Sequence, residues 1–285
     1  MTLIQSTYVV ELRLGHTPDA DDAFMFYGIA SGKVNNPVFE IKHVIEDIET
    51  LNKRALNHEL DVTAISAHAY AYLRNYVILS CGASFGLNYG PVIISKKRFT
   101  ISELGHTKIA VPGRMTSAYL ISRIALGNYP DIQMPFHMIP TAVRDGEVEA
   151  GLVIHEGQIT YETLGLLKVL DLGNWWNVLT NGLAVPLGIN VASSETMSDF
   201  QIQEFEKLFK SSILYGLNHF DDALDYAMTY SRGQARAVIG KFIGMYVNKL
   251  TVDMGTEGLT SIKKMFNLAS DKGILKENIS SLIKV

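Results

Sequence analysis

The chain has very little cysteine: a single residue, Cys81, in the apolar run at residues 76–81. A disulfide within the chain is therefore impossible, and a metal site built from several thiolates is excluded. No apolar run approaches the ~20 residues that a membrane-spanning helix needs. Residues 1–8 lack the basic head and apolar core of a secretory signal. From these absences we expect no membrane partner and a reducing, cytoplasmic setting.

An excess of basic residues is also missing. The chain has 25 Lys and Arg against 29 Asp and Glu, a formal net charge of −4, and its basic residues are scattered. Nucleic acid is therefore not an expected partner, because binding to a phosphate backbone requires a basic stripe. Neither a P-loop sequence nor a dinucleotide fingerprint is present. An anionic small molecule stays open as a partner, because backbone dipoles at helix ends can hold it.

What the chain does have is an alternation of short apolar runs and amphipathic segments. Its 285 residues, 47% of them hydrophobic, suffice for one large or two modest domains. Strands are predicted at residues 9–14, 39–44 and 61–65, with helices at 23–30 and 47–60 between them. This order is typical of a layered parallel sheet, so the predicted fold class is α/β.

The pattern restarts near residue 96, with further strands predicted at 107–111, at 136–139 and in the run that ends at residue 155. From residue 198 to the end the pattern is helical. We therefore predict two α/β domains joined by two hinge strands, with the ligand cleft between them. The large domain comprises residues 1–94 and 188–285 and carries the C-terminal helices, and the small inserted domain comprises residues 95–187.

The stretch Glu-Ala-Gly-Leu-Val-Ile-His-Glu-Gly-Gln at residues 149–158 predicts a buried strand that delivers a histidine to this cleft. In open α/β sheets, ligands bind beyond the carboxyl ends of the strands, which is where His155 would lie. The neighbouring Glu156 would orient the imidazole and stabilise its cation, which suits a base that works near neutral pH. A purely structural histidine is an equally good interpretation at this point.

Three other strand-to-helix loops share this design, at residues 15–22, 65–68 and 111–117. Ser66, Thr116 and Ser117 stand where helices are expected to begin, and free backbone N–H groups there favour a carboxylate or phosphate. Plain helix capping explains each of them taken singly. His16 and His68 lie in two of these loops, but their spacing is not that of a zinc site, so no metal is expected.

The first of these loops is acidic. Asp21 and Asp22 are interpreted as helix-capping residues that interact with the helix dipole, whereas Asp19 is a candidate acceptor for ligand hydroxyls. The sequence Gly-Ala-Ser-Phe-Gly at residues 82–86 has the spacing of a hydrolase nucleophile elbow. The residues that follow, Leu-Asn-Tyr-Gly-Pro, cannot form the helix which that motif requires. We interpret this stretch as a turn between the domains.

Several of these stretches together resemble the 1,4-dihydroxy-6-naphthoate synthase family of the futalosine route to menaquinone. The resemblance spans nearly the whole chain, and the histidine stretch at 151–158 is its most specific part. Its other parts are Gly-His-Thr-Pro-Asp at 15–19, Phe-Met-Phe-Tyr at 24–27, residues 82–91, Asp-Leu-Gly-Asn-Trp-Trp at 171–176 and Pro-Leu-Gly at 186–188. The resemblance implies the bilobal, periplasmic-binding-protein-like fold (type 2), used as an enzyme.

The resemblance also implies a reaction: a lyase, independent of any cofactor, that converts cyclic dehypoxanthine futalosine to 1,4-dihydroxy-6-naphthoate with His155 as its base. Bacterial members carry a Ser-Pro-Cys-Pro-Asn-Asp type of first loop, from which this chain departs. We predict substrate contacts at polar residues of the four loops: His16, Thr17, Asp19, Ser66, His68, Thr116, Ser117 and Glu156.

Two other functions stay open on the sequence alone. A non-catalytic solute-binding protein would use the same fold, although the absence of a secretory signal counts against it. Chorismate dehydratase, a sister enzyme of the same pathway, shares the fold as well. Recovery of an unchanged, tightly bound ligand would favour the binding protein, and parallel assays of chorismate and the naphthoate precursor separate the two enzymes. The oligomeric state is not predicted.

Overall fold

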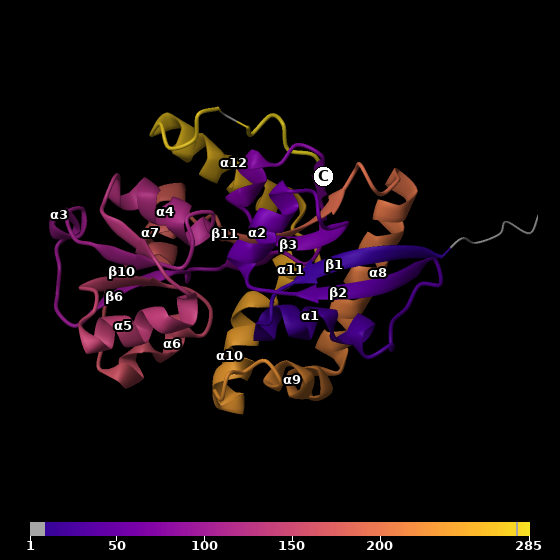
Figure 1. Cartoon of the computed structure of the whole chain (residues 1–285), viewed down its shortest axis with the longest axis horizontal. Coiled ribbons are helices and arrows are strands. Elements are labelled where there is room, and N and C mark those ends of the chain that lie inside the picture. Colours follow the sequence, from indigo (N-terminus) through magenta and orange to yellow (C-terminus); the bar gives the residue numbers. More distant parts are fainter. Residues whose placement is uncertain (1–8, 278) are drawn as a thin grey trace, which may run out of the picture.

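The computed structural model describes residues 9–277 and 279–285. The segment 1–8, on which the expectation about a secretory signal rests, lies outside the described residues. Two β-sheets divide the described chain into two lobes (Figure 1). Lobe 1 comprises residues 9–91 and 185–285, apart from position 278, and lobe 2 comprises residues 92–184. The chain therefore leaves lobe 1 once and returns to it once.

The sheet of lobe 1 has the strand order β2-β1-β3-β11-β4, with β5 paired to β11. Strands β2, β1 and β3 are parallel, whereas β11 runs antiparallel to β3, β4 and β5. The bounds of these strands are β1 Val10–His16, β2 Phe39–Ile45, β3 Val62–Ser66, β4 Tyr76–Ile78, β5 Ser84–Gly86 and β11 Val185–Ser193.

The sheet of lobe 2 has the strand order β10-β6-β9-β7-β8. Strands β9, β7 and β8 are parallel, and β6 is antiparallel to both β9 and β10. The strands are β6 Val92–Ser95, β7 Ile109–Val111, β8 Asp131–Gln133, β9 Ala150–Val153 and β10 Leu167–Asp171. The parallel arrangement predicted for the first three strands is confirmed in β2, β1 and β3. Both sheets are mixed, because the crossing strands β6 and β11 enter them in the reverse direction.

Several helices of lobe 1 begin at residues whose side chains accept hydrogen bonds from free backbone N–H groups. Asp47 accepts hydrogen bonds from Glu49 N and Thr50 N at the start of α2, and Ser198 forms a capping box with Gln201 at the start of α8. The helices are α1 Ala20–Ala30, the 3₁₀ turn η1 Ala69–Tyr72, α2 Ile48–Leu56, α8 Asp199–Asn218, α9 Phe220–Met228, α10 Arg236–Tyr246, α11 Lys249–Val252 and α12 Gly255–Asp271. The expectation of helix to the chain end was too long, since α12 ends at Asp271.

Helix α1 is the best-buried helix of lobe 1. Phe24, Met25 and Phe26 are fully buried, and α1 packs against α8, α9 and α10 (Figure 1). Because both faces are covered, α1 has little amphipathic character, unlike an ordinary surface helix. The loop before α1, which carries Asp19, and the first turn of α1, which carries Asp21 and Asp22, are thereby fixed against a rigid base.

One sequence prediction in lobe 2 was wrong. Residues 136–139 are not a strand, because Pro135 and Pro140 favour the start of helical structure there instead. Residues 172–180 form a helix, which Asp171 caps by accepting from Asn174 N. The helices of lobe 2 are α3 Ile101–Leu104, α4 Ser117–Leu126, η2 Phe136–Met138, α5 Ile139–Asp145, α6 Gly157–Thr160, η3 Tyr161–Leu164 and α7 Leu172–Thr180.

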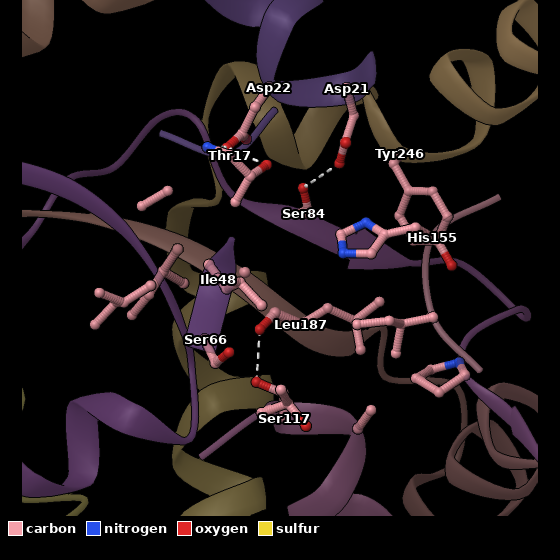
Figure 2. Close-up of a pocket in the computed structure, with 18 of the residues that line it drawn as sticks. Thr17, Asp21, Asp22, Ile48, Ser66, Ser84, Ser117, His155, Leu187 and Tyr246 are labelled. Atoms are coloured by element: carbon pink, nitrogen blue, oxygen red, sulfur yellow. Dashed lines mark hydrogen bonds between the residues drawn. The ribbon is translucent and has the colours of Figure 1, made fainter. Parts of the chain in front are cut away.

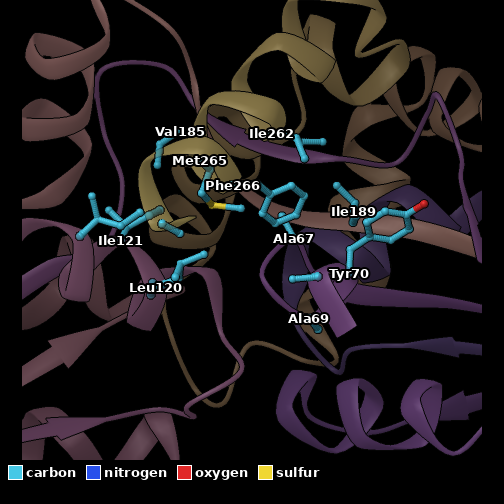
Figure 3. Close-up of a cluster of buried hydrophobic side chains, with 14 of the residues drawn as sticks. Ala67, Ala69, Tyr70, Leu120, Ile121, Val185, Ile189, Ile262, Met265 and Phe266 are labelled. Carbon is cyan, nitrogen blue, oxygen red and sulfur yellow. The ribbon is translucent and has the colours of Figure 1, made fainter. Parts of the chain in front are cut away.

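One apolar cluster joins the two lobes beside the crossing strands. Figure 3 shows Leu120 and Ile121 of α4 facing Met265 and Phe266 of α12, with Ile189 of β11 nearby. Burying such side chains is worth about 1.5–3 kcal/mol each. The lobes are therefore held together at the hinge side, which leaves the opposite side of the gap to the ligand. The predicted domain boundaries at 94/95 and 187/188 stay a prediction.

Candidate functional site

A cavity of about 680 Å³ lies between the two lobes (Figure 2). Its walls come from the loop before α1, from β3, β5 and β11, from the start of α4, from the loop after β9 and from α10. The polar lining residues are Thr17, Asp21, Asp22, Ser66, Ser84, Asn190, Thr116, Ser117, His155, Gln158 and Tyr246. All four loops singled out in the sequence contribute to this wall, so the structure brings them together.

His155 lies two residues beyond the end of β9 and lines the cavity. Its backbone has φ +53°, a left-handed conformation that is uncommon for a residue other than glycine. Gln158 supports this turn: with its amide oriented to satisfy both ends, the amide oxygen accepts from His155 N at 3.1 Å and the amide nitrogen donates to the Tyr246 hydroxyl. The imidazole is thus presented to the cavity by a strained and well-supported turn.

The imidazole faces the carboxylate of Asp19. His155 Nε2 lies 3.3 Å from Asp19 Oδ2, an ion-pair distance, although the pair is not aligned as a hydrogen bond. The second oxygen of Asp19 accepts a 2.8 Å bond from Arg232 Nη1. Arg232 Nη1 also lies 3.6 Å from Glu156 Oε1. Asp19, Glu156 and Arg232 therefore form a charged group around one side of His155.

The charges around His155 set its proton affinity. Burial lowers the pKa of His155, but the negative charges of Asp19, Asp21 and Glu156 outweigh both burial and the Arg232 guanidinium, so the pKa of His155 is raised on balance. Protonation of the imidazole is therefore favoured, and His155 becomes a base only after that proton has left.

Two buried carboxyl groups share the cavity wall with His155. Asp21 accepts a 3.3 Å bond from Ser84 Oγ, and Asp22 accepts from Thr17 N at 2.7 Å and from Thr17 Oγ1 at 2.8 Å (Figure 2). Burial raises the pKa of Asp22 to about 7 and also raises the pKa of Asp21. The interpretation of Asp21 and Asp22 as helix caps was incomplete, because both line the cavity. The N-cap position of α1 belongs to Asp19, whose side chain makes no cap hydrogen bond.

The serine and threonine side chains on the other wall are partly engaged. Thr116 Oγ1 accepts from Tyr119 N and so caps α4, as the capping interpretation expected. Ser117 Oγ donates to Leu187 O at 2.5 Å and accepts from His68 N, so it ties lobe 2 to lobe 1 (Figure 2). Ser66 Oγ accepts from Asn52 Nδ2 at 3.1 Å. These hydroxyls stand beside the start of a ten-residue helix, a setting that favours a carboxylate.

Four of the predicted contact residues are not part of the cavity wall. His16 is buried, stacks on Phe26 and contacts His43 Nδ1 through Nε2 at 3.0 Å. His68 is buried beside the Tyr72 hydroxyl. Burial lowers the pKa of each of these two histidines to about 4. The other two, Asp19 and Glu156, act through the charged group around His155.

Sequence reasoning missed four residues that the structure places at the site: Ser84, Asn190, Arg232 and Tyr246. Ser84 belongs to strand β5, where a turn was predicted, and lines the cavity. Arg232 lies in the Ser-Arg-Gly sequence between α9 and α10, and this turn signal was the only local hint. Asn190 and Tyr246 lie within a strand and a helix and carry no local signal.

Within residues 9–277 and 279–285, no cluster of three or more His, Cys, Asp or Glu side chains is arranged to hold a metal ion. In the same residues, no helix has the length and apolar character needed to cross a membrane.

The sequence profile that describes menaquinone biosynthesis proteins matches residues 12–271 of the chain. The chain belongs to the menaquinone biosynthesis family. Two relatives are named 1,4-dihydroxy-6-naphthoate synthase. The protein of Thermus thermophilus is 36% identical over 264 residues, which cover 92% of this chain and 95% of that protein. The protein of Streptomyces coelicolor is 32% identical over 272 residues, which cover 93% of this chain and 94% of that protein. The resemblance seen in the sequence is confirmed, and these names support an enzyme.

Solved structures place this family member among bilobal binding proteins by fold. An X-ray structure of a protein from Archaeoglobus fulgidus has a TM-score of 0.89 and 47% identity, covering 95% of this chain and 99% of that one. The ligand-binding component of an ABC-type import system from Staphylococcus aureus has a TM-score of 0.72 at 14% identity, with 96% of each chain covered. The alkanesulfonate-binding protein SsuA from Xanthomonas axonopodis has a TM-score of 0.65 at 12% identity, and the match covers 96% of this chain and 97% of that one. The periplasmic-binding-protein-like fold is thereby confirmed.

Proposed function

We propose that this protein is a 1,4-dihydroxy-6-naphthoate synthase that converts cyclic dehypoxanthine futalosine to 1,4-dihydroxy-6-naphthoate by base-initiated carbon–carbon cleavage. The observation that carries the proposal is His155, an imidazole held in a left-handed turn at the wall of the interlobe cavity, with a carboxylate 3.3 Å from its Nε2. The names of the two relatives supply the product.

His155 is suited to the role of general base. The base must accept a proton from the substrate, and the three carboxylates around it stabilise the imidazolium that results. The electron pair released by proton removal then flows toward the ring system while the bond to the sugar-derived part breaks. Because the ring becomes aromatic, the reaction has its own driving force, and one positioned base meets its needs without a cofactor.

The opposite wall is suited to hold the substrate. The aromatic carboxylate would bind at the start of α4, beside Thr116 and Ser117, which line the cavity at a helix N-terminus. Hydroxyls of the sugar-derived part would bind to Ser66, Thr17 or Ser84. Apolar residues, Ile48, Ile65 and Leu187 among them, would cover the ring. Closure of the two lobes over the substrate excludes water and fixes the reacting geometry.

An assay with three compounds tests this proposal. The purified protein is incubated with cyclic dehypoxanthine futalosine, with chorismate and with buffer, and the products are identified by chromatography and mass spectrometry. We expect 1,4-dihydroxy-6-naphthoate from the first compound and no reaction of chorismate. Dehydration of chorismate would reassign the protein to the sister enzyme, and no reaction of either compound would leave a binding protein.

A further inference from the structure

Arg232 lies in the loop between α9 and α10, at a point where the two lobes meet. It has φ +51° and is followed by Gly233 with φ +80°, so two consecutive left-handed residues turn the chain. L-residues adopt this conformation at a cost of order 1 kcal/mol, which other contacts must offset. The contacts of the guanidinium show what holds this turn.

The guanidinium contacts both lobes at once. On lobe 1, Nη1 lies 2.8 Å from Asp19 Oδ1 and Nη2 donates to Pro18 O at 3.1 Å. On lobe 2, Nη1 lies 3.6 Å from Glu156 Oε1 and the guanidinium carbon lies 4.8 Å from the centre of the Phe136 ring. That ring in turn lies 4.7 Å from the ring of His155. The side chain of Arg232 therefore spans the gap.

We propose that Arg232 is a positioning residue that clamps the two lobes together and fixes the Asp19 carboxylate against His155 Nε2. The proposal rests on the proposed function only for its kinetic readout, because the clamp itself is argued from the contacts of Arg232 with both lobes. Opening of the lobes would separate Arg232 from Glu156 and Phe136, and would separate Asp19 from His155 in the same motion.

The burial of Asp19 explains why a clamp of this kind is needed. Its side chain is 1% exposed, and a carboxylate in such a place is costly unless it is paired. Arg232 pairs with Oδ1 and leaves Oδ2 for His155. The Arg232 side chain is 31% exposed, so it reaches Asp19 from the solvent side and can leave it when the cleft opens.

The charges that face His155 predict the sign of the effect. Asp19 faces His155 from the loop before α1, and Asp21 faces it from the first turn of α1. Glu156 lies in the same loop as His155, and Arg232 lies in the α9–α10 loop. The Tyr246 phenol of α10 stands beside the imidazole (Figure 2). Removal of the only cation in this group leaves the three carboxylates unopposed. With the lobes together and Asp19 still 3.3 Å from Nε2, the pKa of His155 then rises further. The loss of the contacts to Glu156 and Phe136 weakens closure of the lobes, and KM reports that effect.

The test compares Arg232→Met with Arg236→Met. Arg236 is a matched control, because it is also a paired arginine of the same region, but its ion pairs are with Asp221 and Asp225, outside the site. The titration of the His155 imidazole is followed by ¹⁵N NMR in histidine-labelled protein. We expect Arg232→Met to move its midpoint up by about half a pH unit or more, a roughly threefold change in proton affinity, while Arg236→Met leaves it in place.

Kinetics supply the second readout. Arg232→Met should raise KM about tenfold or more and move the low-pH limb of kcat/KM to higher pH, in step with the NMR midpoint. Arg232→Lys, which keeps the charge but loses the two-pronged geometry, should restore the midpoint and only part of KM. A His155 midpoint in Arg232→Met equal to that of Arg236→Met overturns the proposal. Absence of turnover in the wild type refutes the proposed function alone, since the NMR comparison still decides on the clamp.

Discussion

Replacement of Asp19 by Asn should shift the pH dependence of catalysis in the opposite direction to the loss of Arg232. Asn has the same shape and keeps an oxygen for Arg232, but it removes the negative charge 3.3 Å from His155 Nε2. At that distance and an effective dielectric constant of 20, the attraction to the imidazolium is about 5 kcal/mol. Arg232 neutralises part of this charge, so we expect a net effect on the order of 2 kcal/mol, roughly a 30-fold loss of proton affinity at His155.

The assay is the pH profile of kcat/KM with cyclic dehypoxanthine futalosine. A base must be neutral to act, so the wild-type rate should rise with pH as His155 loses its proton, with a midpoint above the ordinary histidine value because its pKa is raised. In Asp19→Asn the low-pH limb should move to lower pH, while the plateau rate falls because the imidazole is less well oriented. Asp145→Asn, at an exposed pair with Arg144, is the control and should change neither.

The reasoning is refuted if Asp19→Asn leaves the low-pH limb where it was or moves it to higher pH. Asp22 also titrates in this range, with a pKa of about 7, so the His155 imidazole must be followed directly by NMR alongside the kinetics. A limb that moves while the imidazole signal does not would assign the titration to Asp22 and contradict the role given to Asp19.

Three further predictions concern stability and binding. The pKa of buried His68 is about 4, below its unfolded value of 6.5, so the unfolded chain takes up the proton first as the pH falls. Between pH 8 and pH 5 the wild type should therefore lose about 2 kcal/mol of unfolding free energy relative to His68→Asn, as measured by urea titrations. Gly173→Ala would place a Cβ 2.1 Å from the Tyr89 carbonyl carbon, so the melting temperature of this variant should drop by several degrees. In Gly240→Ala the new Cβ meets only Leu224, at 3.5 Å, so the melting temperature of this control should equal or exceed that of the wild type. Ser117→Ala removes the bond to Leu187 O, so kcat/KM should fall about tenfold, and an unchanged value would speak against the interlobe contact.

The fold was predictable where the information is local. The strand and helix alternation of residues 10–66 follows from short apolar runs and capping residues such as Asp47, and the structure places β1, α1, β2, α2 and β3 there in that order. The prediction failed at residues 136–139, where an apolar run outweighed the two flanking prolines in the sequence interpretation. The reversed direction of β6 and β11 could not be predicted from either strand, because direction depends on the partner strand.

The site was predictable only in part, for a similar reason. His155 stands out because a buried strand ends beside it, and Thr116 and Ser117 stand out because a helix begins there. Arg232 reaches Asp19 across more than two hundred positions of sequence, with only a turn signal to mark it. His16 looked like a site residue because of its loop, but its ring turned inward onto Phe26. Side-chain direction within a loop is set by tertiary packing.

The most direct test of the central claim is turnover of cyclic dehypoxanthine futalosine by the wild type and by His155→Asn, with 1,4-dihydroxy-6-naphthoate measured by chromatography. Asn is close in size to the inner half of the imidazole and cannot accept the proton, so the loss measures the base. We predict that the wild type forms the product and that His155→Asn, still folded and still able to bind the substrate, is slower by at least about 100-fold. Equal rates in the two proteins would contradict the role of His155, and no product from the wild type would contradict the proposed function itself.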